Sequence, residues 1–334
     1  MARIIILLTP LIFIACSSEI PEIKIATYNI YFLDDGISQE RRSNLQQVIN
    51  KLDADIIGFQ EINSPAALKN ILPSEYTIAM IDDPGQVQEL ALAVRPPFKI
   101  KSYKYVFPDT IHDNAFPRTR DLLEVEVAGY RKEFVIWVHH AKSRSGGRLK
   151  TDSRREAAAR LMVGYMKSNL AAENVILIGD FNDNPDDRSL NILEYEDKDA
   201  VGGVDCKEDD FLFNTSEKLL SKDYCSYGYS RLFKETVSDT FQLTVAGARI
   251  ENNKWRGIEH NYFNDVKIKT ILLDQILVSI NLKKYVYESG VFNYSTAIKG
   301  ERSRVRFVEG ELQFTKRGSL ASDHVPVWTI LKFN

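Results

Sequence analysis

The chain has 334 residues, with 43 Lys and Arg against 46 Asp and Glu, which gives a formal charge of −3 at pH 7. Hydrophobic residues make up 44% of it, charged residues 27% and aromatic residues 10%. This composition excludes collagen-like, low-complexity and intrinsically disordered chains. A chain of this length buries a large core without metal or disulfide staples. The mild acidity argues against a protein that coats nucleic acid, but it leaves room for an enzyme that contacts a few phosphates through a metal.

The first 15 residues, MARIIILLTPLIFIA, consist of Arg3 within an otherwise apolar run. The run is shorter than the roughly 20 residues that a membrane-spanning helix needs, and it is typical of a signal peptide. Because Phe13-Ile14-Ala15-Cys16 resembles a bacterial lipobox, we expect residues 1–15 to be removed, Cys16 to carry a lipid, and residues 16–22 to form a short tether. The mature protein is then exported and lipid-anchored in the cell envelope. A plain secretory signal with an incidental cysteine, or a short N-terminal anchor, is the alternative.

Two further cysteines, Cys206 and Cys225, lie in a loop-rich stretch. In an oxidising envelope they would form a candidate disulfide worth about 3 kcal/mol of stability. Two free buried thiols are the alternative. The chain has no Cys-x-x-Cys motif, which disfavours structural zinc.

Two strand–helix–strand units follow the tether. We expect a strand over 23–30, a helix over 41–52, a strand over 54–61, a strand over 133–140, a helix over 153–170 that is capped by Thr151, Asp152 or Ser153, and a strand over 174–183. The strands are continuously apolar instead of alternating, which predicts sheets that are buried on both faces.

The rest of the chain contains a polar region and then more strands. Residues 184–268 are polar and aromatic with weak periodicity, which is typical of long loops around a functional rim. We expect a strand over 270–279, further strands or hairpins over 284–292 and 302–314, and a terminal strand over 322–333. No linker is visible after residue 24, so we expect one catalytic domain over residues 23–334.

Polar residues interrupt or end these apolar strands, and they are Asn29, Glu61, His140, Asp180, Asn182, Asp274, Asp323 and His324. Each alone has an ordinary explanation as a turn residue, a cap or a solvated acid, although a carboxylate such as Asp274 inside an apolar strand needs a partner. Carboxylate and amide oxygens without cysteine suit a hard cation such as Mg²⁺ or Mn²⁺. The histidines suit hydrogen bonds to phosphate oxygens or to a leaving group. Together the residues predict phosphoryl chemistry on a divalent metal.

Six short motifs follow one another along the chain, and their order can be compared with that of a known family. They are Thr27-Tyr28-Asn29, Gln60-Glu61, His140-Ala141-Lys142-Ser143, Gly179-Asp180-Phe181-Asn182-Asp183, Asp274-Gln275-Ile276-Leu277 and Ser322-Asp323-His324-Val325-Pro326. In this order the chain resembles the endonuclease/exonuclease/phosphatase superfamily over about residues 23–332. The resemblance implies a four-layer α/β sandwich of two packed mixed β-sheets flanked by helices.

The resemblance also implies roles for the metal and the attacking water. By it, Glu61 is the principal Mg²⁺ ligand, and Asn29 and Asp323 complete or support the site. Asp180 then activates or orients the attacking water, and Asn182 positions that water and the phosphate. Mn²⁺ is the alternative cation.

The remaining implied roles concern the phosphate and the leaving group. His324, oriented by Asp274, hydrogen-bonds the scissile phosphate, and His140 stands near the leaving oxygen. An arginine in Phe116-Pro117-Arg118-Thr119-Arg120 contacts the phosphate; we expect Arg118, with Arg120 as the alternative.

The surroundings of His140 leave two questions. His139 and His140 are adjacent on a strand and therefore point to opposite faces, so only one faces the site. The spacing to Lys142 and Ser143 favours His140 and leaves His139 as a structural residue. The basic cluster within 142–155 either rings the site and attracts phosphates or forms a solvated loop and helix start.

The predicted function is a monomeric Mg²⁺-dependent phosphodiesterase or nuclease of the envelope, acting on a phosphoester, with nucleic acid among its candidate substrates. A sphingomyelinase-like or sugar-phosphate esterase is the enzymatic alternative. A non-catalytic surface-binding lipoprotein on the same scaffold is disfavoured by the complete polar set. A lipase would expose clustered aromatic residues; Tyr224, Tyr227, Tyr229 and Phe233 are candidates, but base stacking or packing explains them equally well.

Overall fold

The computed structural model describes residues 21–83, 86–117, 120–145, 147–170, 173–203, 208–221, 224–227, 272–292, 300–309 and 311–333. Cys16, Arg118, Cys206, Tyr229 and Phe233 lie outside the described residues. The lipid anchor, the first-choice arginine and the candidate disulfide therefore stay predictions. Among the described residues, none of the helices combines the length and apolarity needed to cross a membrane.

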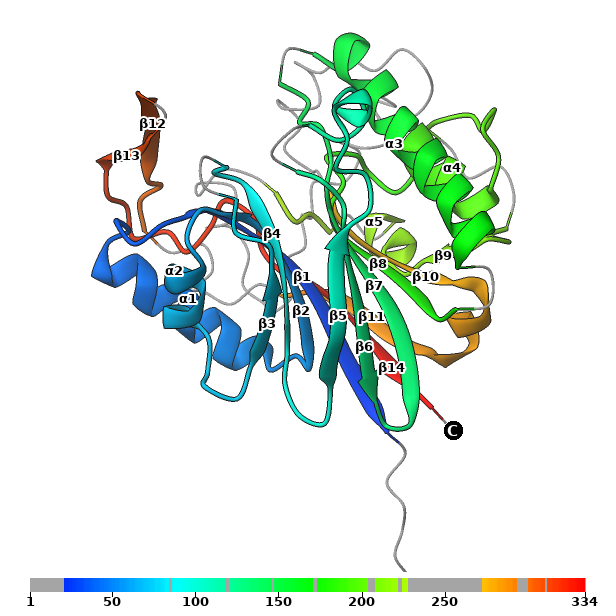
Figure 1. Ribbon diagram of the computed structural model, residues 1–334, viewed down its shortest axis with the longest axis horizontal. Helices are drawn as coiled ribbons and strands as arrows, with labels where there is room; N and C mark the ends of the chain where they lie inside the picture. Colours follow the sequence, from blue (N-terminus) through cyan, green and yellow to red (C-terminus); the bar gives the residue numbers. More distant parts are fainter. Residues whose placement is uncertain are drawn as a thin grey trace, which may run out of the picture.

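The first large sheet combines the start and the end of the chain (Figure 1). In spatial order its strands are β11 (Val286–Val291), β14 (Val327–Lys332), β1 (Glu22–Leu33), β2 (Ile56–Ile62), β4 (Glu89–Val94) and β3 (Thr77–Met80). β1 and β2 run parallel and are joined by α1 (Gln39–Leu52), and α2 (Pro65–Ile71) follows β2. Both helices lie on the outer side of this sheet.

The second large sheet comes from the middle of the chain. Its strands in spatial order are β5 (Lys99–Tyr105), β6 (Leu123–Gly129), β7 (Lys132–His140), β8 (Val175–Asp180), β10 (Asp274–Ser279) and β9 (Leu212–Asn214). The parallel strands β7 and β8 are joined by α3 (Arg148–Asn169), and α4 (Arg188–Tyr195) packs beside α3. The smaller elements are α5 (Glu217–Ser221), the 3₁₀ helices Thr110–His112 and Ile280–Tyr285, and a separate hairpin of β12 (Arg304–Val308) and β13 (Glu311–Lys316).

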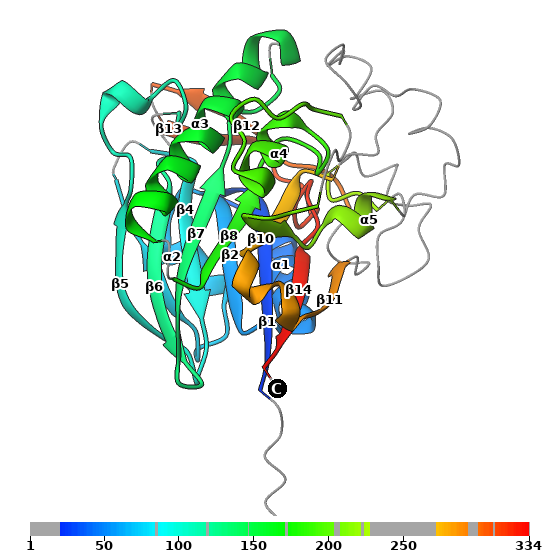
Figure 2. The same ribbon diagram turned by 90° about the vertical axis from the view of Figure 1, so that its right-hand side faces the viewer.

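The two sheets pack face to face between two helical layers, as Figures 1 and 2 show. All six residues of β8 are buried, as the continuous apolar pattern predicts. At the middle of the interface Gly58 lets the sheets approach closely, because a Cβ there would lie 2.6 Å from the side chain of Ile178. The fold is therefore the four-layer α/β sandwich of two mixed sheets that the resemblance implied.

The main difference from the predicted elements is the start of the second crossover helix. α3 begins at Arg148, so Thr151, Asp152 and Ser153 lie inside the helix and do not cap it. Thr151 Oγ1 donates to the carbonyl of Gly147 at 3.1 Å, and Arg148 Nε lies 3.1 Å from Asp152 Oδ2. These contacts four residues apart support an earlier helical turn. The terminal strand is also shorter than predicted, because β14 begins at Val327.

The topology brings the ends of several strands to one edge of the sandwich. Asn29 of β1 lies opposite Gln60 in the parallel strand β2, and His140 of β7 lies opposite Asp180 in the parallel strand β8. Asp274 begins β10 and pairs with Asp180 in the antiparallel direction. β14 runs antiparallel to β1, so the loop before it reaches the same edge.

Candidate active site

A cavity of about 440 Å³ lies at this edge, between the ends of the two sheets. Six of the predicted residues line it: Glu61, His140, Asp180, Asn182, Asp323 and His324. Asn29 and Asp274 stand directly behind them and contact them through hydrogen bonds. The structure thus brings together all of the predicted site residues that it describes.

Asn29 links the two sheets at the floor of the site. Its amide nitrogen Nδ2 lies 3.3 Å from Glu61 Oε1 and 3.1 Å from Asp180 Oδ2, and it donates to both carboxylates. Its amide oxygen accepts from the backbone N–H of Tyr31 at 3.0 Å. Asn29 therefore supports Glu61 and Asp180 by holding their carboxylates side by side.

The backbone around the acidic residues is unusual. Glu61 has φ = 64° and Asn182 has φ = 52°, values that non-glycine residues adopt rarely and that occur often at functional sites. Gly179 lies so close to β7 that a Cβ there would come within 1.9 Å of the carbonyl oxygen of His139. A glycine is required at this position, and the close approach sets Asp180 beside His140.

Asp180 is held by hydrogen bonds on both of its oxygens. Oδ1 accepts from the backbone N–H of Asn182 at 2.9 Å, and Oδ2 accepts from Asn29. The Asn182 side-chain amide donates to the carbonyl of Ala141 at 3.2 Å. Asp180 and Asn182 therefore form one rigid turn at the end of β8.

Asp274 and His324 form a buried pair. His324 Nδ1 lies 2.8 Å from Asp274 Oδ2, and the other ring nitrogen, Nε2, lies 3.9 Å from Asp180 Oδ2. The backbone N–H of His324 donates to Ser322 Oγ at 3.1 Å. The ring of Tyr227 packs against His324 with centroids 4.8 Å apart. The carboxylate and these contacts fix the orientation of the imidazole, with Nε2 on the side of Asp180.

The two cavity histidines have opposite electrostatic surroundings. Burial lowers the pKa of His140 well below its ordinary value, and the positive charge of Arg120 adds to this effect. Burial by itself lowers the pKa of His324 too, but the carboxylates of Asp274 and Asp180 raise that pKa to about 10. Near neutral pH, His324 is therefore protonated and His140 is neutral, which separates their chemical roles.

Glu61 and Asp180, which both line the cavity, have raised pKa values. Burial raises the pKa of Glu61 to about 7, and the neighbouring carboxylate of Asp323 adds to the rise. Burial also raises the pKa of Asp180 to about 6, although His324 opposes the shift. Packing acidic groups together out of water is unfavourable, and it commonly marks a functional site.

The adjacent histidines point to opposite faces of β7, as predicted. His140 Nε2 lies 3.5 Å from Asp180 Oδ2 and 3.8 Å from Glu61 Oε1, inside the cavity. His139 is buried on the other face, with its ring 5.3 Å from Phe181 and 5.8 Å from Phe116. Its position among apolar rings fits the structural role expected for it.

Arg120, the second-choice arginine, lines the cavity. Its Nη1 donates to the carbonyl of Ala141 at 2.9 Å, and its Nε donates to Gln88 Oε1 at 3.1 Å. These bonds hold the guanidinium near Glu61 and Asp180, whose charges act on it.

Arg302 is a cavity residue that the sequence analysis did not single out. Its Nη2 lies 2.5 Å from Asp323 Oδ2, and its guanidinium stacks 4.5 Å from the ring centroid of Tyr31. Its only sequence signal is a run of alternating basic residues, which by itself indicates no more than one face of a strand.

Three arginines of the basic cluster after His140 are buried, whereas Lys150 at the start of α3 is exposed. Arg144 Nη2 lies 2.6 Å from Asp187 Oδ2, Arg148 Nη2 lies 2.9 Å from Asp187 Oδ1, and Arg155 Nε lies 2.7 Å from Asp183 Oδ2. Buried guanidinium groups need such partners, because an unpaired buried charge is very costly. The three arginines therefore fasten α3 to the loop after β8. Arg144 also lines the cavity, but its charge is paired with Asp187.

The cavity residues fit a hard divalent cation. Glu61 Oε2 is buried and has no hydrogen-bond partner, so an oxygen ligand is left over for a metal. Glu61 and Asp323 supply carboxylate oxygens, which Mg²⁺ prefers. Within the described part of the chain, no group of three or more His, Cys, Asp or Glu side chains is arranged as a metal cage. Few protein ligands are typical of Mg²⁺, which keeps several of its waters.

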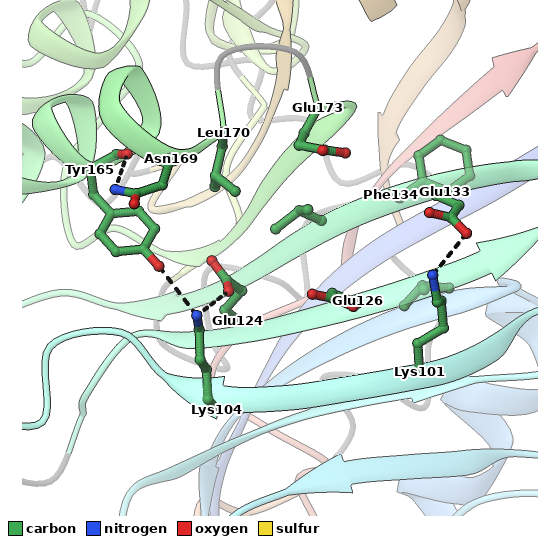
Figure 3. A pocket seen from close by; sticks show the side chains of 12 residues that line it. Lys101, Lys104, Glu124, Glu126, Glu133, Phe134, Tyr165, Asn169, Leu170 and Glu173 are labelled. Carbon is green, nitrogen blue, oxygen red and sulfur yellow. Dashed lines mark hydrogen bonds and ion pairs between the residues drawn. The ribbon is translucent and has the colours of Figure 1, made fainter.

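A second cavity of about 350 Å³ lies on the outer side of β5, β6 and β7 near the end of α3 (Figure 3). Its lysines are engaged by neighbouring groups. Lys101 Nζ lies 2.8 Å from Glu133 Oε1, and Lys104 Nζ lies 3.2 Å from Glu124 Oε1 and 3.3 Å from the Tyr165 hydroxyl. None of the predicted site residues lines this cavity.

Two packed mixed sheets with acidic, amide and histidine side chains at a shared edge define the class of protein as an endonuclease/exonuclease/phosphatase-type sandwich. The model of the Endonuclease/Exonuclease/phosphatase family matches residues 37–254. The chain belongs to this family, and it is accordingly a hydrolase of that superfamily, whose enzymes generally use divalent metals. No curated protein matches the chain.

Solved structures share the fold at low sequence identity. D. rerio TDP2 complexed with a single-strand DNA product is 15% identical, with a TM-score of 0.54, over 93% of this chain and 99% of that one. An endonuclease/exonuclease/phosphatase family protein from Bacteroides thetaiotaomicron is 20% identical, with a TM-score of 0.55, over 95% and 99% of the two chains. A mannosyl-6-phosphatase from the same organism is 20% identical, with a TM-score of 0.54, over 93% and 100%.

Proposed function

We propose that the protein is a Mg²⁺-dependent phosphodiesterase, with Mn²⁺ as a substitute metal and nucleic acid among its substrates. One observation carries the proposal. The buried Asp274–His324 pair, 2.8 Å apart, faces Asp180 across the same cavity that holds the partnerless oxygen of Glu61. A cationic donor, a base and a metal ligand are three groups that together can catalyse phosphoester hydrolysis.

Glu61 would hold the metal as the principal ligand, with Asp323 as the second carboxylate. Asn29 would support the site by holding the carboxylate of Glu61 in place through its amide nitrogen. When bound, the metal supplies positive charge to the phosphoryl oxygens. Arg302 neutralises part of the charge on Asp323 and so allows two carboxylates to share the cavity.

Asp180 is the proposed base, because its carboxylate is held rigidly at the cavity wall and its pKa of about 6 leaves it ionised at neutral pH. It would take the proton of the attacking water. Asn182, fixed in the same turn, would position that water and the phosphate.

His324 is the proposed donor to the scissile phosphate. Nδ1 is engaged by Asp274, which leaves Nε2 free to donate to a phosphoryl oxygen. Neutral His140 would stand near the leaving oxygen, and Arg120 would contact the phosphate in the role first assigned to Arg118.

An activity screen of the full chain in detergent tests the proposal. The substrates are bis-p-nitrophenyl phosphate, p-nitrophenyl phosphate, plasmid DNA, RNA, sphingomyelin and mannose 6-phosphate, each with Mg²⁺, Mn²⁺, Ca²⁺ or EDTA. We expect turnover of the phosphodiesters with Mg²⁺ or Mn²⁺ and none with EDTA. Turnover of phosphomonoesters alone would contradict the proposal in favour of a phosphatase. Turnover of sphingomyelin alone would contradict nucleic acid as a substrate and favour a phosphodiesterase that is specific for lipids.

We also propose that the enzyme works as a monomer at the cell envelope, lipid-anchored through Cys16. The support is the lipobox-like sequence that ends a short apolar run. Cys16→Ser should release the protein from the membrane fraction or block its maturation. Retention of the variant in the membrane with an intact signal peptide, measured by fractionation and mass spectrometry, would contradict lipidation.

A further inference from the structure

The hairpin β12–β13 stands apart from the two large sheets, at the same edge of the sandwich as the cavity (Figure 1). Its base is fastened to α1 and to the residue before it. Ser38 Oγ donates to the carbonyl of Gly318 at 2.8 Å, and Arg41 Nε donates to the carbonyl of Ala321 at 3.1 Å. Because these bonds join the base to the main body, the hairpin has a defined place beside the site.

The two faces of the hairpin differ in chemistry. Val305 pairs with Phe314 and Phe307 pairs with Leu312, so these four side chains share one face. This apolar face turns toward the end of β1, where the ring of Phe307 lies 5.9 Å from that of Phe32. Arg304 and Arg306 alternate with Val305 and Phe307 along β12, and they belong to the other face.

A groove of about 890 Å³ runs between the hairpin and Tyr31. Arg304, Arg306 and Lys316 line it, together with the Gly300–Ser303 segment. Tyr31 and Arg302 line this groove and the active-site cavity alike. The groove and the active-site cavity are therefore adjacent, and the stacked pair of Arg302 and Tyr31 separates them.

The groove carries positive charge that its own acidic groups do not neutralise. Glu301 pairs with Lys316, and Asp323 pairs with Arg302. Among the residues that the structure describes, the guanidinium groups of Arg304 and Arg306 make no ion pair and no hydrogen bond. Two such arginines side by side attract an anion, and guanidinium groups bind phosphate in a well-defined geometry.

We propose that this groove binds a second phosphate group of the same substrate molecule whose scissile phosphate lies in the active-site cavity. The inference rests on the proposed phosphodiesterase function and narrows its substrate class to molecules with at least two phosphates. Arg304 and Arg306 contact the second phosphate, and the Arg302–Tyr31 pair lies between the two phosphate positions. A substrate with one phosphate leaves the groove unused.

Two matched esters test this assignment: the 5′-p-nitrophenyl phosphate of thymidine with and without a 3′-phosphate. They differ only in the second phosphate. The parent should show a KM about tenfold lower for the bisphosphate, as expected for charge-assisted hydrogen bonds to an anion. The double variant Arg304→Ala/Arg306→Ala should lose this advantage and keep the parental kinetics on the single-phosphate ester.

The matched control is Lys99→Ala/Arg131→Ala, which removes two exposed cations, one at the start of β5 and one in the turn between β6 and β7. It should behave like the parent on both esters. The conservative variant Arg304→Lys/Arg306→Lys should retain part of the preference, because it keeps the charge. A dinucleotide and the methyl phosphodiester of a sugar, each compared with and without a second phosphate group, then identify which molecule supplies the second phosphate.

The outcomes separate this inference from the proposed function. Turnover of both esters with one KM, unchanged in the arginine variant, overturns the groove assignment and leaves the phosphodiesterase intact. An equal loss of kcat on both esters in the variant also overturns it, because the hairpin would then act on the catalytic groups. If the parent with Mg²⁺ hydrolyses neither ester, the phosphodiesterase proposal itself fails, and the inference fails with it.

Discussion

Two clusters of buried charged side chains include residues that are close in the sequence, and their charges are arranged differently. In the ionic cluster of Arg144, Arg148 and Arg155 with Asp183 and Asp187, opposite charges meet at 2.6 to 2.9 Å. In the cavity, carboxylates lie close to one another: Glu61 lies near Asp323 and Asp180, and these groups are largely withdrawn from water, although Arg302 pairs with Asp323.

The difference separates structural charge from functional charge. The ionic cluster satisfies its own charges and holds α3 against the loop after β8. The cavity leaves Glu61 Oε2 without a hydrogen bond and raises the pKa of Glu61 to about 7. A buried acidic group in such surroundings is stabilised by a positive ligand. Removing a residue from the cavity should therefore affect activity, and removing one from the ionic cluster should affect stability.

The largest effect is expected from Asp180→Asn. The variant keeps the shape of the side chain but removes the proposed base, and loss of a proton-transfer group lowers the rate by about 10²- to 10⁴-fold. We expect this loss in kcat, with substrate affinity and the midpoint of thermal unfolding close to those of the parent. Near-parental turnover on the substrate found by the screen would show that Asp180 is not the base.

Asp187→Ala should have its main effect on stability. It leaves Arg144 and Arg148 without their closest partner, and breaking a buried ion pair from one side costs about 3–5 kcal/mol. Chemical denaturation followed by circular dichroism measures the free energy of unfolding. A loss below about 1 kcal/mol, together with a large fall in kcat, would place Asp187 in the catalytic machinery instead.

Metal binding should stabilise the cavity and leave the ionic cluster unaffected. A ligand that binds only the folded state adds about 2.7 kcal/mol when its concentration is 100 times its Kd. Mg²⁺ should therefore raise the unfolding temperature of the parent and of Asp187→Ala. It should have little effect on Glu61→Gln, which lacks the charge of the principal ligand. A full Mg²⁺-induced shift in Glu61→Gln would remove Glu61 from the metal site.

Asp274→Asn should have a smaller effect than loss of His324, because it disturbs the orientation and charge of the imidazole without removing it. Loss of a residue that orients a ligand costs about 10- to 100-fold. Adding Asp274→Asn to His324→Ala should change kcat little further, since the two act as one unit. If the double variant loses activity as the product of the two single losses, with its fold intact, the pairing has no catalytic role.

The sequence predicted the cavity better than its surroundings. Glu61 and Asp180 were predictable because strands that run parallel bring their carboxyl ends to one edge, and polar residues at the ends of apolar strands stand out. Asp274 was predictable because it is a carboxylate within an apolar run, and such a group needs a partner. Arg302 was not predictable, because its pairing with Asp323 depends on a loop that no periodic pattern describes. The ion pairs of Arg144, Arg148 and Arg155 were not predictable for a similar reason, since a run of arginines does not reveal the aspartates that the fold places against it.

The strands also differ in how well the sequence predicts them. β1, β2, β7 and β8 are buried on both faces, so their continuous apolar sequences predict them. β5 lies at a sheet edge and is mostly exposed, and its sequence KIKSYKY carries no comparable signal. Burial on two faces is therefore what made an element, or a polar residue within it, recognisable from the sequence.

Glu89 tests whether a buried oxygen without a partner is enough to mark a functional residue. Like Glu61 it has such an oxygen, but it lines none of the cavities described above. Its other oxygen accepts from the backbone N–H of Asp83 at 2.6 Å. Burial raises the pKa of Glu89 to about 7, above its ordinary value near 4.5. Between these two values the folded state binds more protons than the unfolded state, so the contribution of Glu89 to stability falls as the pH rises from 4.5 to 7.

Glu89→Gln should remove this contribution without affecting kcat. The free energy of unfolding, measured by denaturant titration at pH 4.5, 5.5 and 7, should fall less steeply with pH in the variant than in the parent. The change in unfolding free energy across the window should differ between the two proteins by about 2–3 kcal/mol, since one unit of pKa corresponds to about 1.4 kcal/mol. Identical slopes would mean that the Glu89 carboxyl gains or loses its proton equally in both states. A fall in kcat would mean that Glu89 contributes to catalysis although it lines none of these cavities. Position in the cavity would then no longer separate functional from structural buried charges.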